Sequence, residues 1–117
     1  MRTQEDEILL RVFLGENDQR SGQLLYEAVI LKAREFHLAG ATVVRGIMGY
    51  GQHSHPHKAT LFRLSADLPV VVEIVDREEK IQPLLTWLDE VIEDGLVTFE
   101  RVRVLQRSAG DRMAKQP

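Results

Sequence analysis

Three histidines at alternate positions, His53, His55 and His57, are the residues of this chain whose type and spacing most directly suggest chemistry. In an extended segment alternate side chains point the same way, so the three imidazoles could bind one metal ion at about 2.0 Å. Pro56 helps to keep the segment extended. The alternative is a polar, solvent-exposed loop, because no cysteine and no nearby carboxylate completes a set of ligands. The spacing therefore leaves two interpretations, a metal site at these histidines and a solvated loop.

Ser54 lies among these histidines and has the functional group of a nucleophile. Nucleophilic catalysis requires the hydroxyl and its base to be held about 3 Å apart, and a flexible polar loop does not hold them there. We therefore predict that the chain is not an enzyme and has no catalytic residues.

Three glycines, Gly46, Gly49 and Gly51, precede the histidines. Glycine lets a phosphate approach backbone amides, but this spacing is not the G-x-G-x-x-G pattern between a strand and a helix. A strand bulge or the root of a loop requires glycine equally well. From the residues alone, ligand contact and local backbone geometry are both open explanations.

The composition is that of one ordinary folded domain. The 117 residues are 44% hydrophobic, and the net charge of -3 comes from interspersed charges of both signs, unlike a surface for DNA or anionic membranes. The absence of cysteine excludes disulfides and thiolate sites. Residues 1–7 are acidic, and no apolar run approaches the ~20 residues of a membrane span. We expect a cytoplasmic protein with one domain over 1–105, a mobile tail over 106–117, no nucleic-acid partner and no membrane insertion.

The first half of the chain predicts a strand, a helix and a strand. Apolar residues alternate over 8–14, which is typical of a strand. Ser21 is expected to cap a helix over 23–38, and Gly40 to end that helix in a left-handed conformation. A second strand is expected over 41–50, where two internal glycines weaken it.

Strand character returns over 60–64 and 70–75, with a polar interruption between the two runs. Glu73 is the one charged residue of the second run. A carboxylate within a strand faces solvent or an ion-pair partner, and Arg11 and Arg45 are the partners that we consider. We therefore give Glu73 a structural role.

A second helix should follow directly. Asp76 is expected to be its N-cap, with Glu79 three residues later to complete a capping box. Pro83 predicts a kink or an irregular first turn, because an internal proline removes a helical hydrogen bond. Gly95 is expected to end the helix.

A last strand is predicted over 96–105, with a bulge near Glu100 or Arg101 where its apolar phase shifts. The order strand, helix, strand, strand, helix, strand predicts an α+β fold, the ferredoxin-like βαββαβ sandwich of a four-stranded antiparallel sheet with two helices on one face. The other face would carry apolar or mixed residues such as Leu9 and Phe13. Burial of that face against sister subunits predicts a symmetric homo-oligomer.

Three segments resemble a known family: LAGATVVRGIMGYG at 38–51, LSADLPVVVEIVD at 64–76 and EDGLVTFERVRV at 93–104. They are similar to domain-of-unknown-function family 190, an uncharacterised prokaryotic family of the PII-like signalling group. The resemblance covers residues 8–104. It implies a ferredoxin-like homotrimer that binds a small anionic metabolite, such as an adenine nucleotide, in its intersubunit clefts and requires no cofactor. The 51–59 loop would then correspond to the T-loop that signals to a partner protein.

The resemblance implies ligand contacts for seven residues: Thr42, Gly49, Tyr50, Gly51, Gln52, Arg101 and Arg103. The threonine is expected to contact the base, and the glycine-aromatic-glycine segment with the amide after it to approach the phosphates. The two arginines are expected to reach the phosphates at a neighbouring subunit. Genes of the family also occur beside small fluoride-channel proteins, which implies a membrane transporter or channel as the partner.

Two features depart from the PII pattern. Glu93, Asp94 and Gly95 form a short acidic turn where PII proteins have a glycine-rich loop with a basic residue, and carboxylates repel phosphate. No tyrosine is present between residues 52 and 59, so the uridylylation of some PII loops does not carry over. The predicted function is therefore a PII-like sensor, and the alternatives are a metal-binding protein that uses the loop histidines and a ligand-free oligomeric interaction module.

Overall fold

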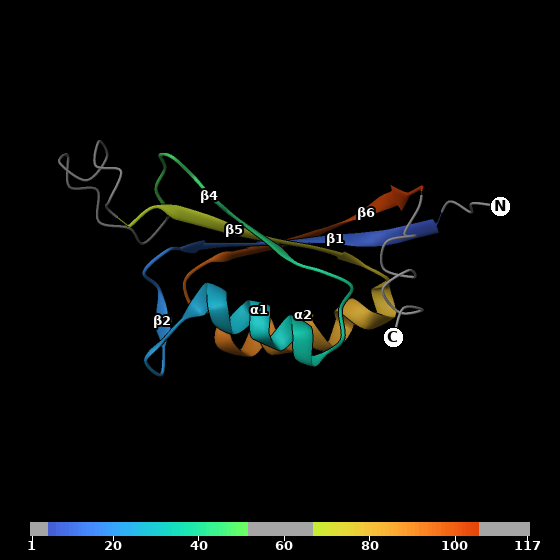
Figure 1. Ribbon diagram of the computed structural model, residues 1–117, viewed down its shortest axis with the longest axis horizontal. Coiled ribbons are helices and arrows are strands. Elements are labelled where there is room, and N and C mark those ends of the chain that lie inside the picture. The colour runs from blue at the N-terminus through green and yellow to red at the C-terminus, as the bar shows by residue number, and fades with distance from the viewer. Residues whose placement is uncertain (1–4, 52–66, 106–117) are drawn as a thin grey trace, which may run out of the picture.

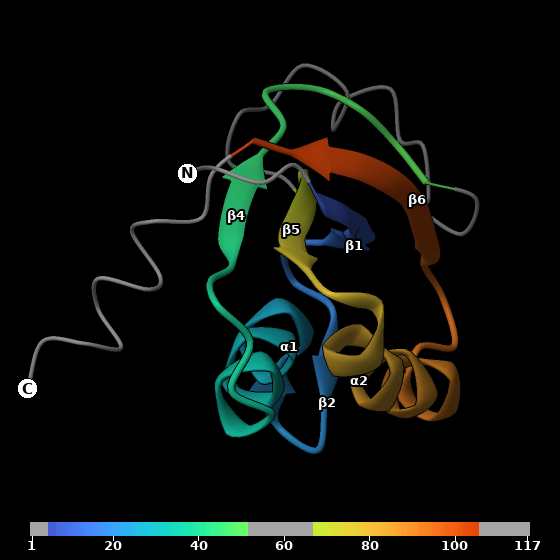
Figure 2. The ribbon, with the colours of Figure 1, turned by 90° about the vertical axis from the view of Figure 1, so that its right-hand side faces the viewer.

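The computed structural model of the chain describes residues 5–51 and 67–105. These residues form two layers, a sheet and a pair of helices that pack on one of its faces (Figures 1 and 2). In chain order the elements are β1 (Glu5–Gly15), β2 (Gln19–Arg20), β3 (Gln23–Leu24), α1 (Leu25–Glu35), β4 (Thr42–Arg45), β5 (Pro69–Asp76), α2 (Glu78–Val91) and β6 (Leu96–Val104).

The main sheet has the strand order β4-β5-β1-β6, and all its neighbouring strands are antiparallel. Strands β1 and β5 are central, and the helices follow β1 and β5 as the βαββαβ pattern requires. The predicted ferredoxin-like sandwich with two helices on one face is therefore confirmed. Strands β2 and β3 form a separate small hairpin before α1.

The core lies between the sheet and the two helices. Alternate side chains of β1 and β5 face the helices, and the helices present residues at helical spacing to them. The largest fully buried side chains of this core are Leu10, Val12, Val29, Val72, Ile74, Ile81, Leu84 and Leu88.

The start of α1 differs from the prediction. Ser21 and Gly22 have positive φ angles of 54° and 79° and form the two-residue turn of the β2–β3 hairpin. Ser21 is therefore not a helix cap. The helix begins at Leu25, after the N-cap residue Leu24. A serine in a polar segment suits a tight turn as well as a cap, and the pairing of the short strands decides between them.

The end of α1 also differs, because His37 rather than Gly40 takes the left-handed conformation. His37 has φ 61° and donates its N–H to the Arg34 carbonyl at 3.0 Å. Leu38 donates its N–H to the Ala33 carbonyl at 3.0 Å, which completes a Schellman motif. The partly buried Leu38 packs against the core, which accounts for the end of the helix three residues before the predicted one.

The second helix has different ends from those predicted. Arg77 is its N-cap residue, and Asp76 is instead the last residue of β5. The helix is continuous through Pro83 in its second turn. It ends at Val91, before Gly95, whose backbone lies so close to β1 that an added Cβ would be 3.0 Å from the Phe13 carbonyl oxygen.

The bulge predicted in β6 is absent from the described ladder, which pairs without a break from Glu5↔Val104 to Phe13↔Leu96. The apolar phase shift has another cause. Val97 faces the helices opposite Val12, and Val102 faces the other side opposite Glu7. Strand β6 therefore has apolar residues on both faces. The predicted second strand is shorter than expected and ends at Arg45, and the predicted strand at 60–64 lies outside the described residues.

The buried carboxylate of Asp76 provides a test of this fold. Only 3% of Asp76 is exposed, and its side chain accepts hydrogen bonds from the N–H groups of Ala39 at 2.9 Å and Arg77 at 2.8 Å. Asp76→Ala removes the acceptor of both amides, so we expect the free energy of unfolding to fall by about 1–3 kcal/mol. Urea unfolding at fixed protein concentration measures this change. The exposed Asp89→Ala should change it by less than about 0.5 kcal/mol, and equal effects of the two substitutions would contradict the role of Asp76.

Candidate functional site

The sheet face opposite the helices, which we call the open face, carries apolar side chains around the charged side chain of Arg11. Arg11 lies on this face, and its Nε is 2.9 Å from Oε2 of Glu73 on β5 and its Nη1 is 3.8 Å from Oε1 of Glu100 on β6. The predicted ion pair of Glu73 with Arg11 is therefore confirmed, and Arg45 has a different partner. The apolar side chains of the open face are Leu9, Phe13, Val44, Val71, Val75, Leu96, Val102 and Val104.

Residues 46–51, which we call the strap, leave the end of β4 and rise on the open-face side of the sheet (Figure 2). The backbone of the strap wraps around the ring of Pro69. The Gly46 N–H donates to the Pro69 carbonyl at 2.7 Å, and an added Cβ would lie 2.8 Å from the Pro69 Cγ at Gly46 and 2.9 Å at Gly49. These two glycines are therefore explained by close backbone approach to a proline ring.

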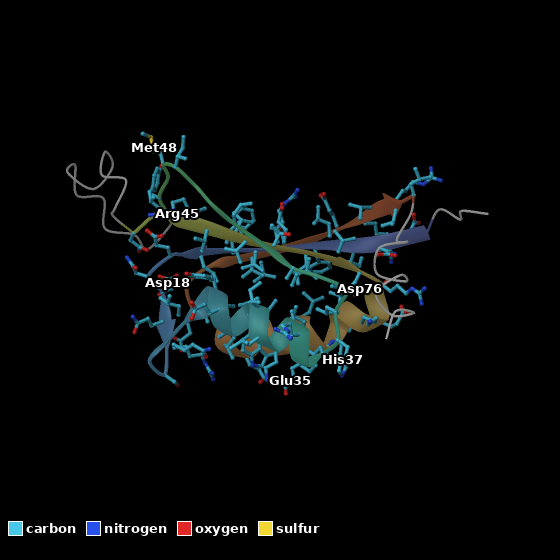
Figure 3. All side chains as sticks on the ribbon, viewed as in Figure 1. Asp18, Glu35, His37, Arg45, Met48 and Asp76 are labelled. Carbon is cyan, nitrogen blue, oxygen red and sulfur yellow. The ribbon has the colours of Figure 1, made fainter. Side chains whose placement is uncertain are left out.

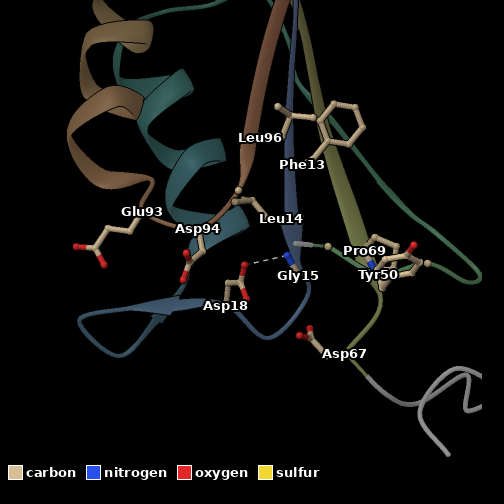
Figure 4. Close-up of a pocket in the computed structure, with 13 residues that line it drawn as sticks. Phe13, Leu14, Gly15, Asp18, Tyr50, Asp67, Pro69, Glu93, Asp94 and Leu96 are labelled. Atoms are coloured by element: carbon tan, nitrogen blue, oxygen red, sulfur yellow. Dashed lines mark hydrogen bonds between the residues drawn. The ribbon is translucent and has the colours of Figure 1, made fainter. Parts of the chain in front are cut away.

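A hollow of about 490 Å³ lies beside the strap at this end of the sheet (Figure 4). Its apolar lining comes from the end of β1, the start of β5, the start of β6 and the strap. Residues of that part are Phe13, Leu14, Gly15, Gly49, Tyr50, Gly51, Pro69, Gly95 and Leu96. Four acidic residues, Asp18, Asp67, Glu93 and Asp94, also line it, and the Glu93 carboxylate points away from the other three (Figure 4).

Two of these carboxylates shape the turn after β1. Asp18 accepts a hydrogen bond from the Gly15 N–H at 2.9 Å, and Asp67 accepts one from the Asn17 N–H at 3.0 Å. An added Cβ at Gly15 would lie 2.9 Å from oxygens of both aspartates, so the two carboxylates converge over this glycine. The hollow consequently presents negative charge, which disfavours a phosphate inside it unless cations come from elsewhere.

Within one chain the predicted ligand residues lie in separate places. Gly49, Tyr50 and Gly51 line the hollow, whereas Thr42 lies on the open face opposite Glu73. Arg101 lies near the far end of the sheet, opposite Ile8. Ile8 and Gly15 are seven residues apart on β1, or about 23 Å, so the arginine could join the strap in one site only if another copy of the chain supplied it.

Arg101 also has a partner within the chain. It faces the helices and its Nη2 is 3.0 Å from Oε1 of Glu78 at the start of α2. Arg103, the second predicted arginine, pairs with Asp6 in the β1–β6 register. The two arginines therefore lie at the same end of the sheet, and their contact with a ligand remains a prediction.

The remaining predicted site residues lie outside the described residues. They are Gln52, His53, His55 and His57. Within 5–51 and 67–105, no group of three or more potential ligands from His, Asp and Glu is placed to hold a metal ion. The metal site at the histidines thus stays a prediction. No helix in the described segments is long and apolar enough to span a membrane.

The carboxylates of the hollow are the residues that the sequence analysis largely missed. Glu93 and Asp94 were noted as an acidic turn, but nothing in the sequence connected them with Asp18 and Asp67. A local signal exists only for Asp18, since an aspartate three residues after Gly15 is typical of a turn stabilised by its own side chain. The four residues line one hollow because three connections meet at one end of the sheet.

Comparisons with known proteins assign the family. A model of the DUF190 family, described as Uncharacterized ACR, matches residues 7–104. This chain belongs to the DUF190 family. It is 43% identical over 99 residues to a UPF0166 protein of Aquifex aeolicus, a match that covers 83% of this chain and 91% of that protein. It is 40% identical over 90 residues to a UPF0166 protein of Methanocaldococcus jannaschii, with coverage of 76% and 82%.

Solved structures of PII-like proteins share the fold of this DUF190 chain. CPII, a nitrogen regulatory PII-like protein from Thiomonas intermedia in a structure bound to ADP, AMP and bicarbonate, superimposes with a TM-score of 0.68 at 19% identity. That match covers 92% of this chain and 95% of CPII. A PII-like signalling protein from Thermus thermophilus gives a TM-score of 0.65 at 15% identity, with coverage of 93% and 96%. At these identities the likeness establishes the fold.

The packing of the strap around Pro69 predicts different effects for two glycine substitutions. Gly46→Ala places a methyl group against the proline ring, so we expect the free energy of unfolding to fall by about 1–3 kcal/mol. Gly40→Ala is the matched control, because nothing lies within 4 Å of an added Cβ there. It should be neutral or stabilising by about 0.4–1 kcal/mol. Urea unfolding of the two variants tests the packing, and an equal cost for both would contradict it.

Proposed function

We propose that this DUF190 protein is a PII-like regulatory protein that binds an adenine nucleotide between copies of itself and signals to a partner protein. The observation that carries the proposal is the open face, which is apolar, free of the two helices and bordered by the strap at one end. The shared fold supports it, because CPII with the same arrangement of helices and sheet is described in complex with ADP and AMP.

Assembly follows from the chemistry of the open face. Val44 is 45% exposed and Leu96 is 56% exposed on that face, beside partly buried residues such as Val71 and Phe13. Large contiguous apolar surface is uncommon on a soluble monomer, and burial against further copies removes it from water. The Arg11–Glu73 ion pair supplies polar contacts at the centre of such an interface. The proposed assembly is a homotrimer, as the resemblance to PII proteins implies.

The nucleotide is proposed to occupy the cleft between two copies. Its base contacts Thr42, and its phosphates approach the strap backbone from Gly49 to Gly51, and Gln52 directly after the strap, in the same copy. Because the carboxylates of the hollow repel phosphate, the neutralising charge comes from Arg101 and Arg103 of the neighbouring copy. In this arrangement Arg101 exchanges its Glu78 partner for a phosphate.

Signalling is proposed to run through the 51–59 loop. This loop begins at the strap, so a ligand that contacts Gly49 to Gly51 acts directly on its root. The partner is a protein, and the resemblance favours a membrane transporter or channel. The proposed role is regulatory and not catalytic.

Nucleotide binding is tested by calorimetry with AMP, ADP, ATP and cyclic nucleotides. We expect at least one of them to bind the wild-type protein, and Thr42→Ala and Arg101→Ala to weaken it about ten- to a hundredfold, as expected for loss of a contact to a base or phosphate. Arg20→Ala, in the exposed β2–β3 hairpin, should leave the affinity unchanged. A wild-type protein that binds none of these nucleotides contradicts the nucleotide proposal and favours an oligomeric interaction module.

Assembly is tested by placing a charge on the open face. Val71→Asp puts a carboxylate within its apolar surface, so we expect sedimentation at micromolar concentration to give the 13.4 kDa mass of one chain in place of a trimer. The control is Leu31→Asp, at a residue of α1 that is 54% exposed, which should retain the trimer mass. Assembly of the Val71→Asp variant to the wild-type mass would contradict burial of the open face.

A further inference from the structure

One side chain, that of Glu16 in the turn after β1, holds the chain on both sides of residues 52–66. Its Oε2 lies 2.8 Å from Nε of Arg45, and its Oε1 accepts a hydrogen bond from Nη2 of the same guanidinium at 3.2 Å. The same Oε1 accepts a hydrogen bond from the Leu68 N–H at 3.4 Å, and the Glu16 N–H donates one to the Leu68 carbonyl at 2.8 Å. Glu16 therefore binds the last residue of β4 and the residue before β5.

The geometry makes this contact stronger than an ordinary surface ion pair. Two nitrogens of the guanidinium meet two oxygens of the carboxylate, and such a bidentate arrangement fixes orientation as well as distance. The side chain of Glu16 is only 20% exposed, which reduces screening by water, whereas that of Arg45 is 55% exposed. Arg45 directly precedes the strap, so its position sets the direction in which the strap begins.

The turn that carries Glu16 also forms a wall of the hollow. Gly15 and Asp18 line the hollow, and Asn17 binds Asp67, which lines it as well. Figure 3 shows Asp18, Arg45 and Met48 at the same end of the sheet, with Asp76 at the other end. The wall of the hollow, the start of the strap and the residues before β5 are thus connected through one turn.

We propose that Glu16 is a latch, a contact that holds the strap in one orientation relative to the wall of the hollow. When the Glu16–Arg45 pair is formed, a displacement of the turn moves Arg45 and Leu68 with it, and loss of the pair releases the strap. The latch belongs to the chain without ligand. Only its use in signalling, as the link between a ligand at the strap and the 51–59 loop, rests on the proposed function.

The test uses the ligand-free full chain with a single spin label on the strap. Because the sequence contains no cysteine, Met48→Cys creates one labelling site at a residue that is 59% exposed. In this background we expect Glu16→Gln to shift the nitroxide spectrum to faster motion and to raise the hydrogen-exchange rate of the Leu68 amide about tenfold or more. Arg45→Met should do the same, and the double variant should resemble either single variant, since both remove one interaction.

The matched control is Glu35→Gln, which removes the 2.8 Å ion pair with Lys32 on α1, in the helix layer away from the strap (Figure 3). It should leave the spectrum and the exchange rate at their wild-type values. A Glu16→Gln variant that matches this control, or a double variant with the summed effects of the two single variants, would overturn the latch. If Glu16→Gln does not fold, Arg45→Met decides the question with the same two readouts.

This experiment and the nucleotide titration can fail separately. If Glu16→Gln changes neither the nitroxide spectrum nor the Leu68 exchange rate while the wild-type protein binds a nucleotide, the latch is wrong and the proposed function stands. If Glu16→Gln changes both readouts in a protein that binds no nucleotide, the latch stands and nucleotide binding is wrong.

Discussion

The two central strands carry apolar side chains on both faces, and within residues 5–51 and 67–105 helices cover only one of these faces. On the helix side Leu10, Val12 and Ile74 are fully buried or nearly so. On the other side apolar residues surround the Arg11–Glu73 pair, and the helices lie on the opposite face of the sheet (Figure 2). This imbalance favours assembly, because a sheet with an exposed apolar face gains stability when another copy covers it.

The end of the sheet nearest the strap is where the fold offers positions for function. Three connections meet there: the turn after β1, the strap with the residues before β5, and the turn before β6. Close packing on Pro69 restricts the strap to glycine at two positions, and Glu16 joins it to the turn. The negative charge of this end explains why the proposed phosphate contacts depend on arginines from a second copy.

Much of the fold could be predicted from the sequence, because the short apolar runs at 8–14 and 70–75, each broken by one charged residue, and the helical spacing after Glu78 leave few other structures. The predicted ends of the helices were wrong at Ser21, Gly40 and Gly95. Serine and glycine fit caps, turns and close packing equally well, and contacts with distant residues choose among these. The bulge expected in β6 was wrong for a related reason, since apolar residues on both faces of a strand imitate a change of phase.

The site was less predictable than the fold. The strap was found from its glycines and its tyrosine. Glu16 meets Arg45, directly before the strap, across 29 residues of sequence, and Asp67 meets the turn after β1 across 50, so neither contact has a local signal. In one copy Thr42 and Arg101 lie apart, so the proposed site needs a second copy to bring them together. The periodicity of a single chain gives no information on how two copies meet.

The most direct test of the central claim, that one ligand site is built from two copies, is complementation between variants. Thr42→Ala and Arg101→Ala protein are each expected to bind the nucleotide weakly. When the two are unfolded together and refolded as mixed trimers, an intersubunit site should regain wild-type affinity at about a quarter of the sites, because one cleft in four receives both intact residues. Calorimetry of the mixture measures this fraction. A mixture that binds no better than its two parents, while the wild-type protein binds the nucleotide, would contradict a site shared between copies.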